Sequence, residues 1–128
     1  MNKFYDIGIA GQIGRYSDAA ETSLGARIFV TSGTPGLTPE GRVPEGIAAQ
    51  AEQAWHNVLC MLKEAGLQRA DIFRICQYLT RQEDIKAYVE VRSRRLGDHR
   101  PASMLLVVPA LVRPEFLVEI EVYAAKRD

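Results

Sequence analysis

The fold is decided by residues 47–65, which read IAAQAEQAWHNVLCMLKEA. Apolar side chains recur there at the spacing of one helix face: Ile47, Ala51, Trp55, Val58, Leu59 and Leu62. Gly66 follows at the place where a helix commonly ends in a left-handed C-cap. The pattern predicts an amphipathic helix that ends near Ala65 and buries one face.

Upstream of this helix, the sequence predicts a strand and a loop. Residues 26–31 (ARIFVT) are rich in β-branched and aromatic side chains and stop at Ser32-Gly33, which is typical of a strand that ends in a turn. Residues 16–24 are its expected hairpin partner. Residues 32–46 contain the densest run of Gly and Pro and are expected to form one loop.

Downstream of the helix, the pattern alternates between strand and helix. Residues 72–80 have the length and composition of a strand. Helical spacing then returns before Gly97, at Ile85, Tyr88, Val89, Arg92 and Leu96. Two more strands are predicted at residues 103–108 and 117–124, and the second of these alternates apolar and polar side chains.

This element order predicts a single α+β domain over residues 1–128. Its mixed sheet would carry both helices on one face. The other face would need a partner, which indicates oligomerisation. In the last strand Glu119 and Glu121 share one face, and two like charges there are costly if buried.

The composition favours small-molecule partners. Sixteen Lys and Arg residues balance sixteen Asp and Glu residues, so no net field attracts nucleic acid or an anionic membrane. No apolar run is long enough to span a bilayer or to form a signal-peptide core, which predicts a cytoplasmic protein. The only two cysteines, Cys60 and Cys76, lie in apolar segments and are expected to be buried free thiols.

Four segments resemble landmarks of the Rid (YjgF) family, the reactive-intermediate deaminases, in the same order from about Ile13 to Ala125. They are Thr31-Ser32-Gly33, Ala49-Gln50-Ala51 with Asn57, Arg100-Pro101-Ala102, and Leu117-Val118-Glu119-Ile120-Glu121. The resemblance implies a chorismate-mutase-like fold in a homotrimer, with a central β-barrel and ligand clefts between subunits. It also implies hydrolysis of imines or enamines, such as 2-aminoacrylate, to a keto acid and ammonia without a metal or cofactor.

The resemblance implies a role for each candidate site residue. Glu119 matches the glutamate that helps to hold the attacking water, and Tyr16 matches a tyrosine that lines the cleft. Gly33 and Thr34 would offer backbone or hydroxyl contacts. Composition alone favours Glu119 as an ordinary polar residue of a strand, and the resemblance reverses that. Tyr16 is equally well explained as an aromatic residue that flanks a turn.

The main departure from the family pattern is at Ser103. Family members carry an arginine at the third place of Pro-Ala-Arg, where it grips the substrate carboxylate, and this chain has Ser103 there. Leu105 and Val89 stand where relatives often have Cys and Asn. Arg100 is a candidate rim charge, although its odd spacing from Ser103 along a strand directs it to the opposite face.

Three function hypotheses therefore stay open. The first is a deaminase with non-standard substrate recognition, in which Ser103 and Tyr16 supply uncharged hydrogen bonds. The second is a trimer that binds or senses a metabolite without catalysis, as Ser103, Val89 and Leu105 would suggest. The third is a ribonuclease that uses the cluster Arg92, Arg94, Arg95, His99 and Arg100. A solvated helix end explains most of that cluster, and neither His56 nor His99 has neighbours at metal-ligand spacing.

Overall fold

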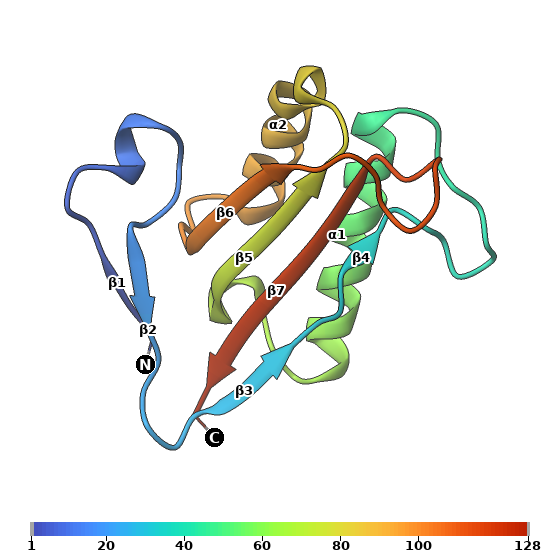
Figure 1. Cartoon of the computed structure of the whole chain (residues 1–128). Coiled ribbons are helices and arrows are strands. Elements are labelled where there is room, and N and C mark those ends of the chain that lie inside the picture. The colour runs from blue at the N-terminus through green and yellow to red at the C-terminus, as the bar shows by residue number, and fades with distance from the viewer. Residues whose placement is uncertain (1, 128) are drawn as a thin grey trace.

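One mixed β-sheet carries two helices on a single face in the computed structural model, which describes residues 2–127 (Figure 1). The strands of this sheet are β3 (Arg27–Val30), β4 (Thr34–Pro35), β5 (Ile72–Leu79), β6 (Ala102–Val107) and β7 (Val118–Lys126). Their order is β3-β7-β5-β6, and β4 also pairs with β7. Among the strand pairs of this sheet, all within the described residues, β5–β6 is the parallel one, and β6 lies at one edge of the sheet.

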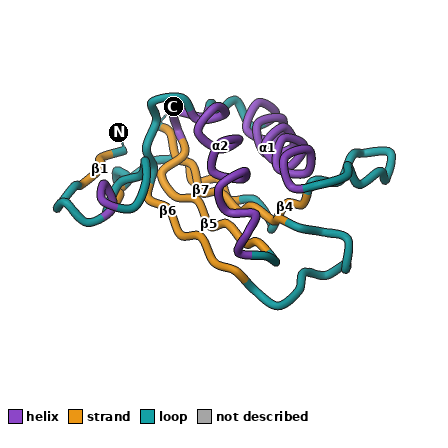
Figure 2. The backbone as a smooth tube through the Cα atoms, turned by 90° about the horizontal axis from the view of Figure 1, so that it is seen from above, coloured by secondary structure: helices purple, strands orange, loops and turns teal. Residues whose placement is uncertain are grey.

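The helices are α1 (Ile47–Glu64) and α2 (Ile85–Leu96), and Figure 2 shows them as a layer above the strands. The predicted left-handed end of α1 is confirmed, because Gly66 has a φ of 74°. Short 3-10 turns connect the elements: η1 (Ala10–Gln12), η2 (Arg69–Asp71) and η3 (Gln82–Asp84). The predicted α+β class, with both helices on one sheet face, is confirmed.

One cluster of buried side chains fills the space between helices and sheet. Trp55 of α1 and Tyr88 of α2 are fully buried there, against Val118, Ile120 and Val122 of β7. Truncating a buried aromatic of this size to alanine costs about 3–5 kcal/mol of unfolding free energy. The helical face that carries Trp55 therefore anchors the fold, as its spacing predicted.

The predicted hairpin between residues 16–24 and the first strand of the main sheet is wrong. β2 (Ala19–Glu21) instead pairs with β1 (Lys3–Tyr5), and β7 occupies the pairing edge of β3. Asp18 shapes this N-terminal arm by accepting backbone hydrogen bonds from Ile7 (2.7 Å) and Ala10 (2.8 Å). These bonds, that from Ile7 foremost, lower the pKa of Asp18.

The two cysteines lie in different environments. Cys76 is buried in β5, as predicted, whereas Cys60 is exposed and the prediction for it is wrong. Val58 and Leu62 of α1 face the sheet, and Cys60 lies midway between them in sequence, which turns it to the solvent side of the helix. Its Sγ lies 3.5 Å from Nε2 of His56, one turn earlier.

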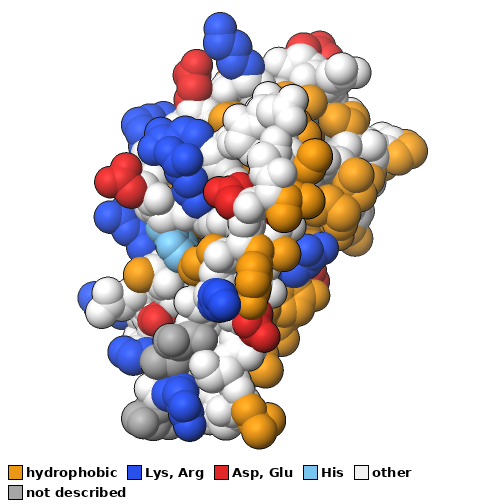
Figure 3. All heavy atoms as spheres, turned by 90° about the vertical axis from the view of Figure 1, so that its left-hand side faces the viewer, with side chains coloured by type: hydrophobic (Ala, Val, Ile, Leu, Met, Phe, Trp, Pro, Cys, Tyr) orange, Lys and Arg blue, Asp and Glu red, His pale blue; other side chains and the backbone are white. Residues whose placement is uncertain are grey.

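The sheet face opposite the helices, here called the open face, is apolar and uncovered within one chain. Ile28 and Val30 of β3 are 65% and 56% exposed, and Leu106 of β6 is 44% exposed. In Figure 3 hydrophobic side chains gather along the margin where this face lies. Exposed apolar surface of this kind is typical of a protein–protein interface.

No helix within residues 2–127 is long and apolar enough to cross a membrane.

Candidate functional site

The structure separates the predicted site residues onto the two faces of the sheet. Tyr16 and Ser103 line a hollow of about 280 Å³ beside α2, here called the helix-side hollow. Glu119 and Gly33 line another, of about 310 Å³, on the open face, here called the open-face hollow. The helix-side hollow is completed by Ile13, Gly14, Ile85, Val89, Arg92 and Leu105.

The alternation of β6 explains where Ser103 points. Side chains at odd positions of this strand, Ser103 and Leu105, turn toward α2, while Met104 and Leu106 turn to the open face and are exposed. Ser103 lies opposite Ile75 of β5 in the parallel pair. The serine that replaces the family arginine therefore lies in the wall of the helix-side hollow.

Gln77 of β5 is fully buried and connects the polar groups of this hollow. Its Nε2 donates to Ser103 Oγ (2.8 Å) and to the carbonyl of Met104 (2.9 Å). Its Oε1 accepts from the Tyr88 hydroxyl (2.6 Å) and from Arg92 Nη1 (3.0 Å). Because the Met104 carbonyl can only accept and Arg92 can only donate, these partners fix the orientation of the Gln77 amide.

Arg92 is the functional candidate that the sequence pattern placed in the wrong environment. It is only 6% exposed, so it does not belong to a solvated helix end. Its guanidinium carbon lies 5.9 Å from the centre of the Tyr88 ring, within cation–π distance. One signal was available: Arg92 shares the helical spacing of the apolar residues Tyr88 and Leu96.

The open-face hollow depends on a close approach between Gly33 and Glu119. Thr31 continues the pairing of β3, because its backbone N–H donates to the Val122 carbonyl and its Oγ1 accepts from the Val122 N–H. The chain then rejoins β7 where Pro35 pairs with Glu119. Between these points, a Cβ built on Gly33 would lie 2.7 Å from Glu119 Oε1. Only glycine leaves that carboxylate in place.

The Glu119 carboxylate is half-buried and accepts no hydrogen bond from any residue in the range 2–127. Burial raises its pKa. The neighbouring Glu121 instead accepts a bond from the Tyr123 hydroxyl (3.1 Å). Of these two carboxylates, Glu119 is therefore the one that is free to accept a hydrogen bond from water or a ligand.

Several family landmarks hold the backbone near this hollow. Asn57 Nδ2 donates to the carbonyls of Pro35 (3.1 Å) and Leu37 (2.9 Å). Just before β7, Gln50 Nε2 donates to the Glu115 carbonyl (3.0 Å) and Gln50 Oε1 accepts from the Leu117 N–H (2.9 Å). These side chains position the segments that carry Gly33 and Glu119.

Thr34 and Arg100 lie apart from the two hollows just described. Thr34 Oγ1 donates to the carbonyl of Ser32 (2.9 Å), and Thr34 lines a separate hollow beside α1. Arg100 is exposed, and its carbonyl accepts a hydrogen bond from Ser17 Oγ. The structure does not bring the Arg100 guanidinium to the helix-side hollow or the open-face hollow.

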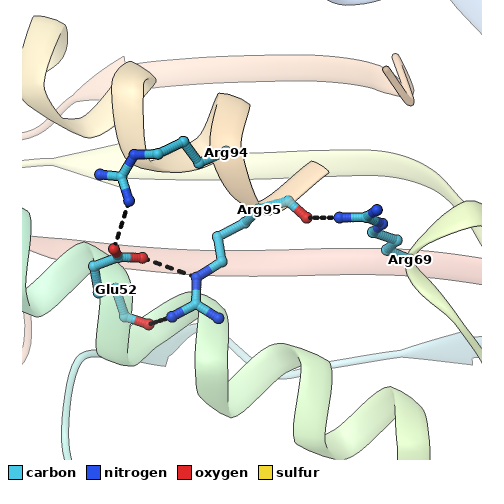
Figure 4. Close-up of polar contacts among 4 residues, drawn as sticks. All are labelled: Glu52, Arg69, Arg94 and Arg95. Carbon is cyan, nitrogen blue, oxygen red and sulfur yellow. Dashed lines mark hydrogen bonds and ion pairs between the residues drawn. The ribbon is translucent and has the colours of Figure 1, made fainter. Parts of the chain in front are cut away.

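The remaining arginines of the basic cluster are held by α1. Glu52 accepts from Arg94 Nη1 (2.7 Å) and from Arg95 Nε (2.8 Å), and Arg69 donates to the carbonyl of Arg95 (2.8 Å) (Figure 4). Arg95 and Arg94 lower the pKa of Glu52. The cluster therefore ties α2 to α1. Nowhere in residues 2–127 do three or more His, Cys, Asp or Glu side chains form a group that could hold a metal.

A mixed sheet with two helices on one face defines a small α+β protein of the chorismate-mutase-like fold. Residues 9–126 match the model of the family described as Endoribonuclease L-PSP. The chain is 35% identical over 118 residues to a RutC family protein of Aquifex aeolicus, covering 89% of this chain and 90% of that protein.

Solved structures agree with this match. The Rid-family protein YyfB from Yersinia pestis aligns with a TM-score of 0.85 and 25% identity over 98% of both chains. TdcF of Escherichia coli, with bound serine, aligns with a TM-score of 0.74 and 27% identity over 89% of this chain and 90% of that one. The chain belongs to the Rid (YjgF) family.

Proposed function

We propose that this protein is a deaminase that hydrolyses an imine or enamine to a carbonyl compound and ammonia. The observation that carries the proposal is the Glu119 carboxylate, which has no hydrogen-bond partner in the described chain and a raised pKa beside Gly33. Such a group can orient a water and accept a proton from it. Membership in the Rid family supports this reaction class.

We further propose that the protein works as a homotrimer in which each site combines two subunits. The helix-side hollow opens near the free edge of β6, and the open-face hollow lies on the other side of the sheet, so one ligand cannot reach both in one chain. The exposed apolar side chains of the open face, among them Val30 and Leu106, supply the interface that trimerisation needs.

The chemistry would require no group beyond these residues and water. Glu119 accepts a proton from water as the water oxygen forms a bond to the carbon of the C=N group, and it then passes this proton to the nitrogen. As the carbon–nitrogen bond of the resulting carbinolamine breaks, the hydroxyl proton of the carbinolamine moves to the nitrogen, which releases ammonia and leaves the carbonyl product. Ser103 and Tyr16 would hold the substrate from the neighbouring subunit. The serine in the TdcF structure supports a ligand of amino-acid size.

The test is ammonia release from freshly generated 2-aminoacrylate and from larger imines, with the spontaneous hydrolysis subtracted. We expect turnover by the wild type, and about a 100-fold loss or more in Glu119→Gln, which keeps the shape but cannot take the proton. Glu121→Gln is the matched control, because the Glu121 carboxylate already accepts from Tyr123. If no imine is turned over while small metabolites still bind tightly, the protein is a binding trimer, as Ser103, Val89 and Leu105 would favour.

A further inference from the structure

We propose that Arg92 is the carboxylate-binding residue of this protein, so that its ligand is a small carboxylate rather than a neutral imine. The guanidinium that relatives place on β6 would then be supplied here from α2, into the same hollow that Ser103 lines. The inference rests on the proposed function in one respect: the carboxylate bound by Arg92 is taken to belong to the substrate that is hydrolysed.

The first support is an uncompensated charge. Arg92 is more than nine-tenths buried, and no carboxylate within residues 2–127 lies in ion-pair distance of its guanidinium. Its contacts are a neutral amide oxygen of Gln77 and the face of the Tyr88 ring. A buried cation without an anionic partner is costly, and an anionic ligand would remove that cost.

The second support is the direction of the free donors. Arg92 Nη1 faces Gln77, whereas a Cβ built on Gly14 would lie 3.9 Å from Arg92 Nη2 and 3.4 Å from the ring of Tyr16. Nη2 therefore points to the loop that closes the hollow. A guanidinium carries five N–H donors, and the structure occupies one of them with a protein acceptor.

The third support comes from Ser103 and Tyr16. Because Ser103 Oγ accepts from Gln77, its own hydroxyl proton is left for another acceptor. The Tyr16 hydroxyl makes no hydrogen bond within the described chain, and no acidic side chain lines the hollow. The hollow thus offers one cationic and two neutral donors and no competing anion, which is the pattern that a carboxylate needs.

Gln77 is the positioning residue of this arrangement. It binds Ser103 with its nitrogen and Arg92 with its oxygen, so both donors are held by one buried amide. Removing the Arg92 charge should therefore change the selectivity for a charged ligand. Loosening the network alone should weaken charged and neutral ligands alike.

The test is an NMR titration of the full-length protein with pyruvate and with pyruvamide, its neutral amide. We expect the wild type to bind pyruvate about 10- to 100-fold more tightly than pyruvamide, and Arg92→Met to abolish this preference. Arg94→Met, two residues further along α2 and bonded to Glu52 on the surface, should keep it. The Nε–Hε resonance of Arg92 should also shift when pyruvate is added to the wild type. This measurement does not depend on whether a variant folds.

The proposal is overturned if the wild type does not prefer pyruvate, if Arg92→Met keeps the preference, or if the Arg92 resonance does not respond. Since binding is measured without turnover, a pyruvate preference in a protein that hydrolyses no imine would disprove the proposed reaction and leave the role of Arg92 intact.

Discussion

The helix-side hollow and the open-face hollow differ in the sign of the charge that lines them. The first contains a buried guanidinium and two hydroxyl groups, and the second contains an unpaired carboxylate with a raised pKa. The two are separated by the thickness of one sheet. Donors that can hold a ligand and an acceptor that can activate water are both present, but they come together only if a second copy contributes one of them.

The largest effect should come from preventing that contact. Leu106 is 44% exposed on the open face, and Leu106→Glu would place a charge in the proposed interface, where burying it is costly. We expect light scattering to show a monomer and turnover to fall by at least about 100-fold. Leu24→Glu, at a residue 97% exposed and outside the sheet, is the control. A Leu106→Glu variant that stays trimeric and active would refute the interface.

Gly33→Ala should disturb the open-face hollow and leave the helix-side hollow unchanged. Its new Cβ would lie 2.7 Å from Glu119 Oε1, so the carboxylate has to move, and turnover should fall by about 10-fold with little change in pyruvate binding. Gly11→Ala is the control, because a Cβ there meets nothing within 4 Å. Equal activity of the two variants would mean that the position of Glu119 does not matter.

The pH dependence of turnover should report Glu119. Because burial raises the pKa of this carboxyl, kcat/KM should fall on acidification with a midpoint above the ordinary value of 4.5, and Glu119→Gln should lose this acid limb.

The same raised pKa predicts an effect on stability. A pKa that is higher in the folded state than in the unfolded state means that the free energy of unfolding declines as the pH rises through that interval. Glu119→Gln should thus be slightly more stable than the wild type at neutral pH and equal to it in acid, in urea unfolding. Destabilisation at pH 7 would assign Glu119 a structural role.

The smallest effect should come from the surface contact between the helices. Glu52→Gln removes the ion pairs with Arg94 and Arg95, and such exposed pairs contribute about 0–1 kcal/mol each. Urea unfolding should show a loss of about 0–2 kcal/mol for the two pairs together, with turnover unchanged. Strong loss of turnover would connect the basic cluster to the site.

The sequence predicted the helices and the strands β3, β5, β6 and β7 well because their periodicity reflects burial directly. The short strand β4, Thr34–Pro35, lies in the segment that was predicted to be a loop. The spacing of Trp55 and Leu62 and the alternation of β7 correspond to one buried face each. The pairing of residues 16–24 was wrong because a strand partner is a long-range property: β7, from the other end of the chain, pairs with β3.

The site was only partly predictable for the same reason. Glu119 and Ser103 follow from the family pattern. That they lie on opposite faces of the sheet becomes clear only once the register of β5, β6 and β7 is known. Arg92 was grouped with Arg94 and Arg95 because they are neighbours in sequence. Two or three positions along a helix are enough to turn a side chain from the core to the solvent. Gln77 was not singled out, because nothing in the sequence around a lone amide in a strand shows its partners.

The most direct test of the account is complementation between two damaged subunits. Glu119→Gln disables the open-face hollow, and Val89→Trp should fill the helix-side hollow. Each variant alone should be inactive, whereas trimers co-expressed from both should regain about a quarter of the wild-type turnover per site, since random mixing leaves that share of sites with both halves intact. Mixed trimers as inactive as their parents would contradict a site shared between subunits.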